Sequence, residues 1–215
     1  MTIYFVKGWC TFASNLKNVR HKIAVIHSLN TKRTLLAKAL SCLSGYKFIR
    51  NRTVYEWRRM FGVEESQMHH FNNQFLVLSS SFVERITVEF DYPDFVSSGA
   101  LFADVLSLQS KMDEKVVVCN SPVDTRMIRG LSDLTGRYAA QHYDSVIHVR
   151  STDATEFDGL FTGFYEKHHI PYHLYDGAAE IEDIVNSIVR EVEMPKVKSV
   201  SSAVYEAIGF CTFKN

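Results

Sequence analysis

The chain has 215 residues, 46% of them hydrophobic and 22% charged, which suits a globular protein with a sizeable core. Lys plus Arg and Asp plus Glu both number 24, so the net charge is zero, and nucleic-acid binding would need a local basic patch. No apolar run reaches the roughly 20 residues of a membrane span, and the four separated cysteines form no CxxC pair. We therefore expect a cytoplasmic protein that does not bind membranes.

Short β-branched runs alternate with amphipathic stretches along the chain. Residues 1–21 could add an edge hairpin, and strands are expected at 23–26, 46–49, 94–96, 116–119, 145–149 and 171–174. Apolar residues recur with helical spacing at 35–43, 101–108, 126–143 and 179–193, and most of 54–89 is also expected to be helical. The strands are apolar throughout, which predicts one α/β domain over residues 1–195, with a mostly parallel sheet between two helical layers. A C-terminal tail, 196–215, is not placed by any pattern.

The junction at 27–34 has the layout of a phosphate-binding loop, with an apolar strand before it and a helix after it. In the P-loop pattern G-x-x-x-x-G-K-[ST], the glycines let the backbone cradle phosphates, the lysine neutralises them and the hydroxyl binds Mg²⁺. Only Thr34 matches, because His27, Lys32 and Arg33 replace the glycines and the lysine. A βα turn without a ligand fits these residues too. The candidate nucleotide-binding residues are Ser28, Asn30, Thr31, Lys32, Arg33 and Thr34, with Thr34 also the candidate metal ligand.

Three longer segments extend the pattern over most of the chain. They are KIAVIHSLNTKRTLLAKALSCLSGYKFI from residue 22, YDSVIHVRS from residue 143 and FYEKHHIPYHLYDGAAEIEDIVNSIV from residue 164. In order and spacing, the chain resembles the P-loop kinases of the nicotinamide riboside kinase and nucleoside or nucleotide kinase type, with a degenerate Walker A loop. The resemblance implies a three-layer α/β P-loop NTPase-like domain that binds ATP and Mg²⁺ beside a nucleoside-like acceptor.

The chain departs from this family at three places. The P-loop lysine is missing, and Ser97 and Ser98 stand where relatives carry an aspartate at a strand end. The connection 151–169 contains no arginine, although relatives have an arginine-bearing lid there, and Asp158 belongs to its remnant. Because phosphoryl transfer depends on positioning and cationic stabilisation, the three losses together point to impaired catalysis.

The segment FIRNRTVYEWRRMFG, residues 48–62, is the one basic stretch interleaved with aromatic residues. In the resembled kinases this region helps to form the acceptor pocket, and such residues can contact phosphates and stack on a base. An amphipathic helix with a solvated basic face and buried aromatics is the plainer interpretation. The candidate substrate-binding residues are Arg50, Arg52, Tyr55 and Arg58.

Other polar clusters have simpler interpretations. The pairs His69–His70 and His168–His169 lack the i, i+4 spacing of helical metal ligands, so we interpret them as surface histidines. Ser121 and Asp124 fit a helix-capping turn better than a cleft.

Three functions follow from these patterns. The first is a degenerate nucleoside/nucleotide-kinase-like protein that binds a nucleotide or another phosphate-bearing small molecule and acts as a regulatory protein or subunit. The second is an active ATP-dependent kinase in which Lys32 or Arg33 replaces the usual lysine. The third is a protein–protein interaction module with a filled cleft, for instance with Leu29 in the phosphate cradle. A protein partner or a homo-oligomer is compatible with the first and the third.

Overall fold

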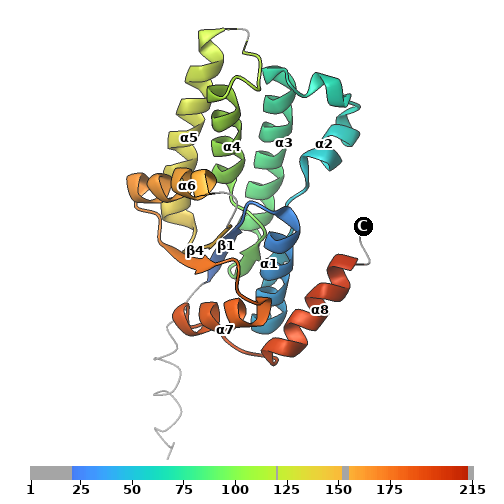
Figure 1. Cartoon of the computed structure of the whole chain (residues 1–215), viewed down its shortest axis with the longest axis vertical. Helices are drawn as coiled ribbons and strands as arrows, with labels where there is room; N and C mark the ends of the chain where they lie inside the picture. The colour runs from blue at the N-terminus through green and yellow to red at the C-terminus, as the bar shows by residue number, and fades with distance from the viewer. Residues whose placement is uncertain (1–20, 120, 152–154, 213–215) are drawn as a thin grey trace, which may run out of the picture.

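The computed structural model describes residues 21–119, 121–151 and 155–212, and Figure 1 shows their arrangement. The hairpin expected within residues 1–21 lies almost entirely outside this part of the chain. Among the described residues, no helix is long and apolar enough to cross a membrane.

One parallel sheet of five strands lies at the centre of the described structure, in the order β2-β3-β1-β4-β5. The central strand β1 is buried on both faces, with Ile23 to Ile26 fully shielded from solvent. This double burial explains the continuous apolar runs in the sequence and confirms the predicted parallel sheet. The strands are β1 (Lys22–Ile26), β2 (Lys47–Ile49), β3 (Phe95–Ser97), β4 (Ser145–Arg150) and β5 (Tyr172–Asp176).

Helices cover both faces of the sheet, and successive residues of β1 point to opposite layers. Ile23 and Val25 pack with α1 (Asn30–Ser44), α7 (Ile181–Glu191) and α8 (Val200–Thr212). Ala24 and Ile26 pack with the opposite layer, and Phe71 and Val105 belong to a further apolar cluster within it. That layer contains α3 (Phe71–Phe90), α4 (Leu101–Asp113), α5 (Pro122–His142) and α6 (Thr155–His168), while α2 (Val54–Phe61) and a short 3₁₀ turn (Glu65–Gln67) precede α3.

The strand predicted at 116–119 is wrong. This segment forms only an isolated bridge between Val118 and His70, and Val116 and Val118 are exposed while Val117 is buried. A short β-branched run with one buried residue can serve as a loop that anchors two helices, so composition alone misassigned it. The capping interpretation of Ser121 and Asp124 is confirmed, since their side chains form a reciprocal capping box at the start of α5.

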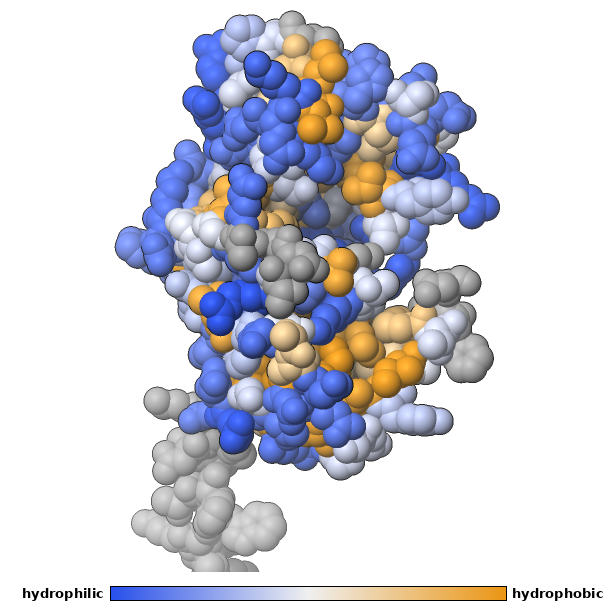
Figure 2. All heavy atoms as spheres, viewed as in Figure 1, coloured by the Kyte–Doolittle hydropathy of each residue, from blue (hydrophilic) through white to orange (hydrophobic). Residues whose placement is uncertain are grey.

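Residues 200–212 form α8, which lies along α1 (Figure 1). Ala203, Val204 and Ala207 are buried, and these small side chains let the two helices approach closely. The Lys38 ammonium lies 5.1 Å from the Phe210 ring centre. Figure 2 shows hydrophobic surface gathered where α8 lies beside α1. Most of the segment that the sequence left unplaced therefore forms a helix, and it packs on the core through Ala203, Val204 and Ala207.

We expect Ala207→Glu to lower the free energy of unfolding by about 3 kcal/mol or more, because the variant puts an unpaired carboxylate between α8 and α1. Urea unfolding measures the change. The matched control is Tyr205→Glu, an exposed position on the same helix that should change stability by less than about 0.5 kcal/mol. Equal effects of the two variants would show that α8 does not dock as described.

Candidate functional site

The connection between β1 and α1 is only three residues long. Strand β1 ends at Ile26 and α1 begins at Asn30, with Leu29 at the N-cap position and no side-chain capping bond. Residues 30–34, which the P-loop alignment placed in a loop, form the first turns of α1. A phosphate cradle needs a longer loop whose backbone N–H groups converge on the anion. The turn observed here is shorter than the loop that the P-loop alignment implies.

Contacts at this turn tie it to the end of β5. His27 is buried, and its Nδ1 accepts a hydrogen bond of 2.8 Å from the Leu29 backbone N–H. The Lys32 ammonium donates to the Gly177 carbonyl. A Cβ atom at Gly177 would lie 2.1 Å from the Arg150 carbonyl oxygen, so the segment after β5 packs too closely for any side chain. Leu29 is 58% exposed and does not fill a cradle.

Arg33 points away from the turn, toward α3 and α4. Burial lowers the pKa of its guanidinium, with the Asp104 carboxylate and the Arg85 guanidinium as the nearby charges that modify this effect. Of the other predicted nucleotide-binding residues, Ser28 and Thr31 are exposed and Thr34 is half-buried. Lys32 and Arg33 are adjacent in sequence, but their side chains lie in different places. Lys32 contacts the segment after β5, and Arg33 lies near Asp104 and Arg85.

Arg85 is a buried charge that the sequence analysis did not single out. Its side chain is 2% exposed, and Nη2 lies 3.4 Å from Oδ2 of Asp104, whose own side chain is 39% exposed. The Arg85 Nε and Nη1 atoms have no hydrogen-bond acceptor within the described residues. The same holds for the buried indole Nε1 of Trp57. A buried donor without an acceptor costs free energy of folding. Three such nitrogen atoms, two on Arg85 and one on Trp57, leave buried donors without acceptors in this part of the described structure.

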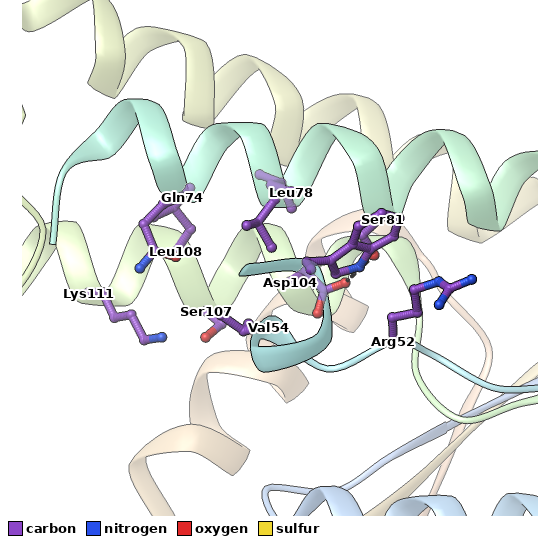
Figure 3. Close-up of a pocket in the computed structure, with 11 residues that line it drawn as sticks. Arg52, Val54, Gln74, Leu78, Ser81, Asp104, Ser107, Leu108 and Lys111 are labelled. Atoms are coloured by element: carbon purple, nitrogen blue, oxygen red, sulfur yellow. Dashed lines mark hydrogen bonds between the residues drawn. The ribbon is translucent and has the colours of Figure 1, made fainter. Parts of the chain in front are cut away.

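Trp57 lines a pocket between α2, α3 and α4 (Figure 3), whereas Arg85 lines a separate hollow at the ends of β2 and α3; Ser81 lines both. Ser81 and Asp104 face each other across the pocket of Figure 3, with a hydrogen bond of 3.4 Å, and Lys111 and Arg52 lie at its two ends. The cavity volume is about 70 Å³, which is room for about two waters and less than a whole nucleotide fills without side-chain movement. Trp57 and Ser107 are among the other lining residues.

The four predicted substrate-binding residues do not share one pocket. Arg52 lines the pocket of Figure 3, Tyr55 and Arg58 line a neighbouring hollow, and Arg50 lines a third. Each arginine has a glutamate partner: Arg50 pairs with Glu56, Arg52 with Glu84 at 2.8 Å and Arg58 with Glu65 at 3.0 Å. Helix α2 buries Trp57, as the amphipathic interpretation expects, but it exposes Tyr55, which that interpretation counted among the buried aromatic residues.

A second buried polar network lies at β4 and α6. His148 is fully buried, with Nε2 2.9 Å from Oδ1 of Asp158 and Nδ1 2.9 Å from the Tyr165 hydroxyl. The Ser151 backbone N–H donates to the other Asp158 oxygen at 3.2 Å. Asp158, which the sequence assigned to a lid remnant, thus fixes the end of β4 to α6. Spacing alone does not bring these residues together, so no sequence signal could have found the network.

The described residues contain no group of three His, Cys, Asp or Glu side chains arranged to hold a metal ion. His69 and His70 have ring centres 3.9 Å apart but no third ligand of that kind. A magnesium ion at Thr34 would need its remaining ligands from nucleotide phosphates and water, as Mg²⁺ often does at phosphate sites.

The strand order and the helices on both faces define a three-layer α/β P-loop NTPase-like fold. No protein-family model and no curated protein matches the chain. Among solved structures, it resembles a deoxyadenosine kinase from M. mycoides with bound dATP, with a TM-score of 0.59 and 12% sequence identity, over 80% of this chain and 99% of that one. At this identity the likeness establishes the fold, and it confirms the fold class predicted from the sequence.

We expect stability to fall as the pH drops below about 6.5. Burial lowers the pKa of His148, so the unfolded chain takes up a proton that the folded chain resists. Below the pKa of this histidine in the unfolded chain, the free energy of unfolding should fall by up to about 1.4 kcal/mol for each pH unit. Above that pKa, His148 should not change the stability.

Urea unfolding between pH 8 and pH 5 measures this slope. His148→Gln is the matched variant, since its amide can donate to Asp158 and accept from Tyr165 but does not titrate. A shallower slope in the variant is expected, and an unchanged slope would remove His148 as the cause.

Proposed function

We propose that this chain is a nucleoside-kinase-like protein that binds a nucleotide or another phosphate-bearing small molecule, does not transfer phosphate efficiently and acts as a regulatory protein or subunit. The observation that carries the proposal is the three-residue β1–α1 turn, with Lys32 bound to the Gly177 carbonyl. Kinases of this fold class depend on a loop and a lysine that hold the β- and γ-phosphates. The short turn and the contact of Lys32 with the Gly177 carbonyl are what favours impaired transfer in this proposal.

The ligand site of this proposal is formed by two adjacent pockets that share Ser81: one between α2, α3 and α4 that Trp57 lines, and one at the end of β2 that Arg85 lines. Donors without acceptors, on Arg85 and Trp57, call for a ligand rich in acceptor oxygens. Lys111 and Arg52 add positive charge at the ends of the first pocket. A phosphate group would provide acceptors for the unpaired donors and balance the positive charge, because it carries negative charge and several acceptor oxygens. The likeness to a kinase with bound dATP supports a nucleotide as the class of ligand.

Calorimetric titration with AMP, dAMP, ATP, dATP and GTP tests the proposal, with adenosine as the uncharged comparison. We expect phosphate-bearing ligands to bind at least tenfold more tightly than adenosine, with little difference between Mg²⁺ and EDTA. ADP formation from ATP with a panel of nucleosides should stay at background. Sustained ADP formation would establish the active-kinase alternative, and no binding by any of these compounds would favour the protein-interaction alternative.

Arg85→Met separates a ligand-binding arginine from a structural one. The variant keeps the length of the side chain and removes its charge, so nucleotide affinity should fall at least tenfold. The free energy of unfolding of the unliganded protein should be unchanged or rise by about 1 kcal/mol, because a poorly paired buried charge is replaced by an apolar group. Arg126→Met, at an exposed position on α5, is the control for both measurements. A large loss of stability with unchanged affinity would assign Arg85 a structural role.

A further inference from the structure

Helices α4, α5 and α6 form a groove on another side of α4 from the pocket of Figure 3. Helix α6 crosses α4 and α5 (Figure 1), and each of the three helices lines the groove with residues three or four positions apart on one face. Leu106 faces the groove, whereas the next two residues of α4, Ser107 and Leu108, line the pocket of Figure 3. Helix α4 therefore separates the two cavities, and they share no lining residue.

The floor of the groove is apolar, and there is open space above it. Leu106 and Phe164 are buried in one apolar cluster, and Leu160 packs against that cluster. Gly163 lies in the wall, and a Cβ atom at this residue would meet nothing within 4 Å. The groove has a volume of about 350 Å³, which lies in the range of small-molecule sites and equals the volume of about twelve waters. A compact organic molecule therefore has the right size for it.

Polar side chains on α4 and α5 line the groove without partners. The Arg129 guanidinium is exposed and makes no ion pair within the described residues. The Ser132 hydroxyl and the Gln109 amide have no hydrogen-bond partner in the same part of the chain. An apolar floor beside a few polar groups is the usual composition of a small-molecule site. The ligand that fits has an apolar body and one polar end.

The charges of the groove favour a ligand with a single negative charge. Lys167 donates to Oδ1 of Asp133 at 2.7 Å, and this contact lowers the pKa of Asp133, so the pair has no net charge. Arg129 is the remaining charge that lines the groove. A carboxylate carries one charge and matches the planar fork of a guanidinium. The second charge of a phosphate dianion would meet the Asp133 carboxylate without a cation to balance it.

We propose that the groove between α4, α5 and α6 is a second binding site, which takes a small carboxylic acid with an aromatic or aliphatic body. The carboxylate binds Arg129, and the apolar body lies on Leu106 and Phe164. The inference does not depend on the proposed nucleotide site, because Arg85 and Trp57 line other cavities.

NMR titration of the isotope-labelled full chain with phenylbutyrate and octanoate, up to about 10 mM, tests the proposal. Acids of this size should bind with a dissociation constant on the order of 1 mM. Phenylbutyramide has the same body without the charge, and it should bind at least about tenfold more weakly. Equal affinities for the acid and the amide would overturn the proposal, and so would the absence of binding by both acids.

Gly163→Leu tests the location of the site. A Cβ bond on a helix tilts toward the N-terminus, so the new side chain leans toward Leu160 and fills the groove. Affinity for phenylbutyrate should fall at least about tenfold. Gly159→Leu is the matched control, because Gly159 lies one turn earlier on α6, also has room for a Cβ atom and does not line the groove. Circular dichroism verifies that both variants remain folded, and binding that survives Gly163→Leu would overturn the proposal.

Arg129→Met tests the charge. The variant should weaken phenylbutyrate binding at least about tenfold and leave phenylbutyramide binding unchanged. Arg126→Met, one turn earlier on α5 and outside the groove, is the control. Arg85→Met should also leave acid binding unchanged, even if no nucleotide binds to the protein. Acid binding that is lost in Arg85→Met and kept in Arg129→Met would place the acid in the nucleotide site and overturn the proposal.

Discussion

The buried guanidinium of Arg85 is the constraint around which this face of the molecule is arranged. It has one long contact to a half-exposed carboxylate and two nitrogen atoms without an acceptor among the described residues. Desolvating a charge this poorly paired costs several kcal/mol, so the fold must recover that free energy elsewhere. The apolar clusters of the layer formed by α3 to α6 supply part of it, and they hold α3 and α4 in place around the charge.

The position of this charge fits the topology of the sheet. In open parallel sheets, ligands bind at the carboxyl ends of the strands, where the connections to the helices converge. At the end of β1 the short turn lies beside Gly177, whose carbonyl accepts a hydrogen bond from Lys32. At the end of β2 a hollow is lined by Asn51, Ser81 and Arg85. The unpaired donors of Arg85 therefore lie near the end of β2 and not at the turn that follows the central strand.

The sequence predicts the sheet well and this site poorly, for identifiable physical reasons. Strands buried on both faces are continuous apolar runs, so β1 and β4 are visible in the sequence. The P-loop pattern directed attention to Arg33 and Lys32, but a pattern does not state where helix α1 begins or which way each side chain turns. Arg85 lies in SSSFVERITVEF, which reads as a polar helix with a solvated arginine. Its position four residues after the buried Ser81 and four before the buried Glu89 places it on the inner face, but that face is identified only when the packing of α3 is known.

Helix α3 links the core of its layer to the candidate site. Val83 and Arg85 are two residues apart on this helix and therefore point to nearly opposite sides. Val83 is exposed, whereas Arg85 is buried, and Leu78 of the same helix belongs to the apolar cluster shared with α4. The guanidinium has a single long contact to Asp104, so the packing of α3 and not a close ion pair holds it in place. A substitution that loosens this packing is therefore expected to displace the unpaired nitrogen atoms of Arg85 as well as to lower stability.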